Sequence, residues 1–88
     1  MKRKHRIIGV HVTDRAKDAI RVQSILTEHG CNIRTRLGLH DAGETHCSPG
    51  GVLLLEVVGD DGACDALAAK LAGLEGVEVK RMEFDHQD

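Results

Sequence analysis

Residues 39–51, LHDAGETHCSPGG, hold the densest group of chemically reactive side chains and lie between two apolar segments. His40, His46 and Cys47 offer the imidazole and thiolate ligands that nickel, zinc and copper accept. Because neighbours such as His46 and Cys47 seldom point at one ion, a site shared between subunits fits better than a site within one chain. The simplest interpretation is a long solvated connection between strands, and a metal site at these three residues is the second hypothesis.

The same segment also places a thiol, Cys47, directly after an imidazole, His46. Nucleophilic catalysis needs a base within ~3 Å of the nucleophile and an oxyanion hole. A glycine-bounded loop is a poor platform for such geometry, and no second motif fixes the partners. We therefore expect a protein that is not an enzyme.

Length and composition indicate one small globular domain, residues 1–88 with a core of about 5–84. The chain is 41% hydrophobic and 30% charged. No apolar run approaches the ~20 residues that span a bilayer, and the basic start lacks the apolar region of a secretory signal. We expect a cytoplasmic protein without a membrane partner.

Two further features argue against direct nucleic-acid binding. The net charge is −2, and Phe84 is the single aromatic residue, whereas modules that grip single strands stack bases on aromatic rings. Three widely spaced cysteines, Cys31, Cys47 and Cys64, match neither a disulfide framework nor a zinc knuckle. Cys31 and Cys64 are expected to pack in the core.

The first half of the chain predicts a strand, a helix and a second strand. Ile7–Val12 is a β-branched run, and apolar residues then recur at helical spacing, Ile20 among them, until Gly30. In the next strand Ile33, Leu37 and Leu39 share one parity, which predicts that they face the core and that Arg34 and Arg36 face outward. The terminal stretches Lys2–Arg6 and Asp85–Asp88 are expected to fray.

The second half repeats this order at a constant offset, which aligns Gly30 with Gly76. Val52–Val58 reads as a buried central strand, Asp60 can cap a helix, and Val77–Phe84 makes the last strand. Two βαβ units predict an α+β protein with the ferredoxin-like βαββαβ arrangement: a four-stranded antiparallel sheet with two helices on one face. The first and third strands should be central.

The sheet face without helices is the first functional clue. Either Leu53, Leu55 and Val57 or the alternate set containing Leu54 must point outward on the third strand, so an aliphatic strip is left without a cover. Such strips are usually partner sites, and most soluble oligomers are symmetric. We expect a homo-oligomer, either a dimer or a tetramer.

Four segments, RIIGVHVTDRAKDA, CNIRTRLGLH, CSPGGVLLLEVVGD and LAGLEGVEVKRMEF, resemble the small proteins described as regulators of the iron-only hydrogenase system. The resemblance runs from about His5 to Phe84, and RLGLH followed by CSPGG is its most specific part. That family looks like ACT-type domains and like the C-terminal domain of nickel-responsive repressors. The resemblance implies an ACT-like, homo-oligomeric regulatory module.

ACT-type domains bind amino acids near the junction of the first strand and helix, which here is Thr13, Asp14 and Arg15. These residues are the candidate ligand site, with helix capping as the alternative for Thr13 and Asp14. The nickel repressors carry a DNA-binding segment before this domain. About six residues precede the first strand here, so we expect no operator binding of that kind.

The sequence thus favours a non-enzymatic regulatory or ligand-sensing module with a small-molecule effector, linked to iron-only hydrogenase or other metalloenzyme systems. The alternative is a metal sensor or metal-handling protein that uses His40, His46 and Cys47.

Overall fold

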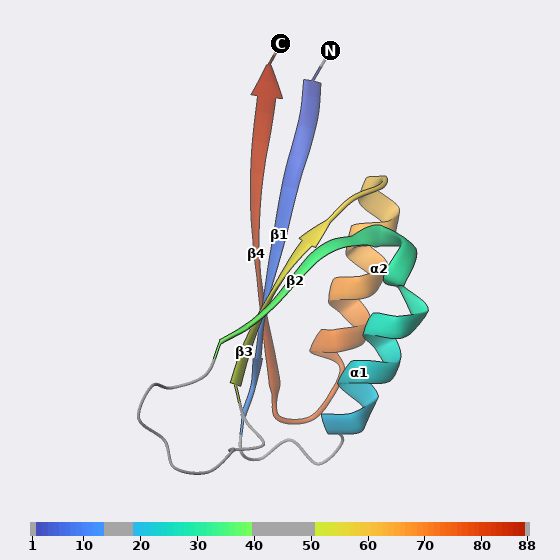
Figure 1. Cartoon of the computed structure of the whole chain (residues 1–88), viewed down its shortest axis with the longest axis vertical. Coiled ribbons are helices and arrows are strands. Elements are labelled where there is room, and N and C mark those ends of the chain that lie inside the picture. Colours follow the sequence, from blue (N-terminus) through green and yellow to red (C-terminus); the bar gives the residue numbers. More distant parts are fainter. Residues whose placement is uncertain (1, 14–18, 40–50, 88) are drawn as a thin grey trace.

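The computed structural model describes residues 2–13, 19–39 and 51–87, and it has the predicted ferredoxin-like α+β fold (Figure 1). Helices α1 (Ala19–Glu28) and α2 (Asp61–Ala72) lie together on one face of the sheet, and a short 3-10 turn, η1 (Gly30–Asn32), leads from α1 into the second strand (Figure 1). One antiparallel sheet in the order β2-β3-β1-β4 is formed by β1 (Lys2–Val12), β2 (Ile33–Leu39), β3 (Gly51–Val57) and β4 (Val77–Gln87). The first and third strands are central, as the sequence predicts.

Local sequence signals fix the ends of α2. The Asp60 carboxylate accepts a hydrogen bond from the Ala63 amide at 2.8 Å, which satisfies a backbone donor that the first turn leaves free. Gly73 ends the helix, and Gly76 supplies the positive φ of 81° that turns the chain into β4. In the ranges that the structure describes, neither helix has the length and apolar character needed to cross a membrane.

The core lies between the sheet and the two helices. Ile8 and Val10 on β1, Leu55 on β3 and Leu67 on α2 are fully buried, and Cys64 packs among them as predicted. Two predictions about apolar residues were wrong. Ile20 on α1 is 82% exposed, and Cys31 is exposed rather than packed. Among the described side chains of α1, the buried apolar ones are Val22, Ile25 and Leu26.

The predicted fraying was also wrong for Lys2–Arg6 and for residues 85–87, whereas Asp88 lies outside the described residues. β1 and β4 pair along their whole length, from Lys2 opposite Gln87 to Val12 opposite Val77. Their outer ends extend past both helices as a two-stranded ribbon, with the two termini side by side (Figure 1). One of the side chains that suggested fraying, Lys4, forms an ion pair across the ribbon with Glu83 at 3.9 Å.

We predict that Leu67→Ala lowers the free energy of unfolding by about 2–5 kcal/mol, because the lost side chain leaves a cavity in a close-packed core. Urea unfolding followed by circular dichroism measures this change. The matched control Ile20→Ala, at a position that is 82% exposed, should cost less than about 0.5 kcal/mol. Similar losses for the two variants would contradict the assigned core.

Candidate functional site

Within residues 2–13, 19–39 and 51–87, no helix covers the sheet face opposite α1 and α2, which we call the open face. The alternation of side chains along the central strands decides which residues it carries. On β1, Ile8 and Val10 are 0% exposed under the helices, so Ile7 and His11 lie on the open face. On β3, Leu55 is also 0% exposed, which places its neighbour Leu54 on the open face. The outward set of β3 is therefore the one that contains Leu54.

An irregularity in β2 reverses the parity predicted for that strand. Ile33 pairs with Val57, but Thr35 pairs with Glu56, so one extra residue is inserted at this point. After the bulge Leu37 and Leu39 share the open face with Thr35, and the prediction that they face the helices was wrong.

Arg36 correspondingly lies on the helix side, where its guanidinium donates to the side-chain oxygen of Gln23 on α1. The prediction that Arg36 faces outward was therefore also wrong.

The result is an apolar surface with members on all four strands, which we call the open-face strip. Leu37, Leu39, Met82 and Phe84 are 51%, 45%, 53% and 49% exposed, so about half of each side chain meets solvent. Cross-strand pairing joins Leu37 to Leu54 and Ile7 to Met82. The strip consists of Leu37 and Leu39 on β2, Val52 and Leu54 on β3, Ile7 on β1, and Met82 and Phe84 on β4.

A polar cluster borders the strip beside Phe84. His5 Nε2 lies 2.7 Å from Glu56 Oε2, and Thr35 donates its hydroxyl to Glu56 Oε1 at 2.7 Å. His86 Nε2 lies 3.4 Å from His5 Nδ1. The hydrogen bonds from Thr35 and then His5 favour the charged carboxylate, so they lower the pKa of Glu56 below its ordinary value.

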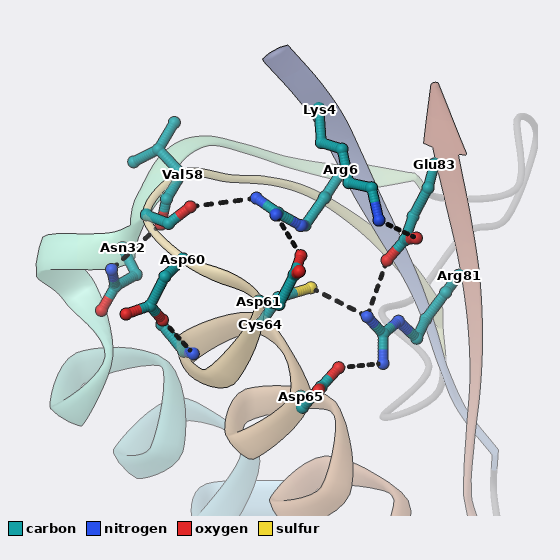
Figure 2. Close-up of polar contacts among 12 residues, drawn as sticks. Lys4, Arg6, Asn32, Val58, Asp60, Asp61, Cys64, Asp65, Arg81 and Glu83 are labelled. Atoms are coloured by element: carbon teal, nitrogen blue, oxygen red, sulfur yellow. Dashed lines mark hydrogen bonds and ion pairs between the residues drawn. The ribbon is translucent and has the colours of Figure 1, made fainter. Parts of the chain in front are cut away.

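A second polar cluster lies on the helix side, where β1 and β4 leave the helices (Figure 2). Arg6 is 7% exposed and donates to the Gly59 carbonyl at 3.0 Å and to the Asp61 carboxylate. This bond lowers the pKa of Asp61, and it raises the pKa of Arg6. A buried cation with both partners in place anchors β1 to the start of α2.

Arg81 continues this cluster from β4 and ties the ribbon to α2 (Figure 2). Its guanidinium contacts Asp65 at 2.8 Å and Glu83 at 2.7 Å, and it donates to Cys64 Sγ at 3.5 Å. Burial raises the pKa of the Cys64 thiol, which keeps it protonated and a poor nucleophile. The charged groups of the helix-side cluster thus pair with one another, although Arg6 Nε is buried without a hydrogen-bond partner among the described residues, and the role of the cluster is structural.

The residues predicted from sequence as a site are only partly described. Thr13 donates its hydroxyl to the Gly76 carbonyl at 2.7 Å, and its amide donates to the same oxygen at 2.9 Å. These bonds join the end of β1 to the turn before β4, which is a structural role. Asp14 and Arg15, and the predicted metal ligands His40, His46 and Cys47, lie outside the described residues.

A shallow hollow between α1 and α2 is a weaker candidate for a functional site than the open face. Arg21, Ile25 and Leu74 line it, and the ion pair of Lys70 with Glu28 at 3.2 Å runs along it. Across residues 2–13, 19–39 and 51–87, no three histidine, cysteine or acidic side chains converge on one point that could hold a metal ion. The open face, with its strip and the cluster around His5, is therefore the candidate functional surface.

We predict that Glu56→Gln lowers stability near pH 7 and that the difference disappears in acid. Glu56 has a lowered pKa in the folded state, so its charge stabilises the fold above the ordinary glutamate pKa of ~4.3. This contribution is lost as pH falls through the lower pKa of the folded protein. Urea midpoints measured from pH 7 to about 3 should converge for the variant and the unchanged protein.

The control for this prediction is Glu78→Gln. Glu78 is 62% exposed in its side chain and lies 3.8 Å from His11, without a close hydrogen bond. Its replacement should leave the pH dependence nearly unchanged. A gap between Glu56→Gln and the unchanged protein that stays constant down to pH 3 would contradict the assignment.

Comparison with known proteins identifies similar structures. No family model matches the chain, and no curated protein matches its sequence. An uncharacterized protein from Thermotoga maritima is 27% identical, with a TM-score of 0.75 over 96% of this chain and 99% of its own. CPII from Thiomonas intermedia, a nitrogen regulatory PII-like protein solved with ADP, AMP and bicarbonate, has a TM-score of 0.55 at 7% identity, covering 98% of this chain and 91% of its own. A PII-like signaling protein from Thermus thermophilus has a TM-score of 0.53 at 9% identity, covering 97% and 91%. The two PII-like proteins share the fold with this chain, and the Thermotoga protein matches it along nearly its whole length.

Proposed function

We propose that the protein is a non-enzymatic, ACT-like regulatory module that assembles with copies of itself through the open face and senses a small-molecule effector. The open-face strip is the observation that carries this proposal. Four of its seven large apolar side chains are about half exposed, on the sheet face that none of the described helices covers. An exposed apolar surface with members on all four strands is costly in water, and a partner that covers it removes the cost.

A second copy of the chain fits this surface better than an unrelated partner. The strip crosses the sheet and is bordered by polar groups, His5 and Glu56 beside Phe84 and the pair His11 and Glu78 near Val52. An apolar centre with a polar rim is the ordinary anatomy of an interface. Two copies related by a two-fold axis would each place the same strip against the other, with no further surface required.

The effector-sensing part of the proposal draws on the comparisons and on the resemblance. CPII, which shares the fold, was solved with ADP, AMP and bicarbonate, so a ferredoxin-like sheet of this kind can serve as a small-molecule sensor. The segments RLGLH and CSPGG resemble regulators of the iron-only hydrogenase system. This resemblance supports the proposal that the protein regulates a system that contains a metalloenzyme. The junction of Thr13, Asp14 and Arg15 remains the proposed place for the effector.

We predict that Leu54→Lys converts the assembled protein into a folded monomer. A lysine at the centre of the strip places a charge against the apolar surface of the partner. Size-exclusion chromatography with light scattering at micromolar concentration gives the mass, and circular dichroism confirms that the variant is folded. The neighbouring change Leu55→Lys, on the buried side of the same strand, should instead unfold the domain.

Ile20→Lys is the matched control, because Ile20 is the most exposed large apolar residue on a helix among the described residues. It should leave the assembly intact. A monomer mass for the unchanged protein would contradict the proposal, and so would dissociation by Ile20→Lys with none by Leu54→Lys.

Native mass spectrometry of the protein purified from its own host tests effector sensing separately. We expect a bound small molecule in a stoichiometric amount, released on denaturation, that raises the melting temperature when it is added back. A ligand-free protein whose melting temperature does not respond to the host's small-molecule extract would contradict this part of the proposal.

A further inference from the structure

The two ring nitrogens of His5 on β1 have different partners on the open face. Nε2 lies 2.7 Å from a carboxylate oxygen of Glu56 on β3, and Nδ1 lies 3.4 Å from His86 Nε2 on β4. The second oxygen of Glu56 is occupied by the Thr35 hydroxyl at 2.7 Å. Side chains of β3 and β4 thus contact the His5 imidazole directly, and Thr35 on β2 holds the carboxylate of Glu56 in place.

These contacts fix which ring nitrogen of His5 donates to Glu56. Thr35 donates to Glu56, and an ionised carboxylate can only accept, so the short contact requires His5 to carry its proton on Nε2. A neutral His5 then has a bare lone pair on Nδ1. That lone pair is directed at the side where His86 presents its own Nε2, and both rings are solvent-accessible, since the side chain of His5 is 42% exposed and His86 is exposed.

The separation of the two nitrogens matches a shared ligand. At 3.4 Å the contact is a long hydrogen bond, beyond the range of about 2.7–3.2 Å that is usual for N–H···O bonds. Two zinc–nitrogen bonds of ~2.0–2.1 Å at a tetrahedral angle place their nitrogens about 3.4 Å apart. We propose that His5 Nδ1 and His86 Nε2 form a two-histidine clamp for a divalent transition metal of the zinc type.

The surroundings of His5 support a metal ligand more than an incidental contact. Histidines that bind metals usually donate their other ring N–H to a carboxylate, which fixes the tautomer and makes the ligating nitrogen more basic. Glu56 occupies that position for His5, and Thr35 holds Glu56 in turn. By contrast, His11 on the same strand has a carboxylate, Glu78, at 3.8 Å but no second imidazole nearby among the described residues.

The backbone holds the two ligands on regular strands. His5 is opposite Phe84, and His86 is opposite Arg3, so the two histidines are diagonal neighbours on one face of an antiparallel pair. Sites on strands hold their geometry better than sites on loops. Two imidazoles occupy two positions of a tetrahedral ion, and water or an incoming donor completes the set. This clamp needs no assembly through the open-face strip, so its failure and that of the proposed function are distinguishable.

The test is a Zn²⁺ titration of the full chain, followed by calorimetry and by ¹H–¹⁵N NMR of the histidine side chains. The expected result is one ion whose binding shifts the ¹⁵N resonances of His5 Nδ1 and His86 Nε2. A full-length variant with His40, His46 and Cys47 changed to alanine should keep this event, which separates it from any metal binding by residues 40–47. Assignment of the resonances in the unchanged protein gives the same answer if that variant does not fold.

Three substitutions complete the design. His5→Ala and His86→Ala should each weaken this event at least tenfold. Glu56→Gln should weaken it by about 10–100-fold at unchanged stoichiometry, because it removes the group that orients His5. The control His11→Ala should leave it unchanged. Resonances of His5 and His86 that do not move at saturating Zn²⁺, or equal binding by His5→Ala, would overturn the proposal.

Discussion

The structure depends on how the side chains of β1 alternate between the two faces of the sheet. This central strand is hydrogen-bonded to β3 on one edge and to β4 on the other. Because it is fixed on both edges, its register cannot slip by one residue without exchanging Ile8 and Val10 for Ile7 and Gly9 in the core. The same constraint that buries one set of side chains under the helices holds the other set on the open face. The core and the candidate functional surface are two consequences of one register.

The helix side and the open face use their polar groups differently. On the helix side Arg6 and Arg81 are paired with acids from α2 and β4, and these pairs anchor the ribbon of strand ends to the first turns of α2. On the open face the imidazoles of His5 and His86 are accessible to solvent, and they lie beside each other. The polar side chains that an incoming ligand could reach therefore lie on the face that also carries the open-face strip.

The sequence predicted the fold well because its signals repeat. Two strand–helix–strand units, the cap at Asp60 and the apolar run of β3 agree with one another, and together they indicate a ferredoxin-like sheet with an open face. The faces to which the side chains of β2 point could not be predicted from the sequence. Counting alternate residues from Ile33 places Leu37 toward the helices, and nothing in the sequence marks the bulge that turns it to the open face. The ends of β1 and β4 were misjudged for a related reason. Their polar residues resemble a frayed terminus until each strand is known to be the partner of the other.

The site was harder to predict than the fold. His5 and His86 lie 81 positions apart in sequence, and only the pairing of the first strand with the last brings them together. The sequence drew attention to His46 and Cys47 because they are neighbours along the chain. Residues that become neighbours only in the folded sheet give no such signal. A search for histidines that share one sheet face on β1 and β4, which are neighbours in the predicted fold, could have found the pair.

Assembly through the open face is the central claim, and intermolecular NMR contacts test it most directly. A mixed sample of ¹³C-labelled and unlabelled protein, recorded with an isotope-filtered NOE experiment, reports only contacts between different copies. The account predicts NOEs that join the Leu54 and Met82 methyl groups of one copy to the strip of another, including the Phe84 ring. Intermolecular NOEs confined to methyl groups of α1 and α2, or none at concentrations where light scattering shows an oligomer, would contradict it.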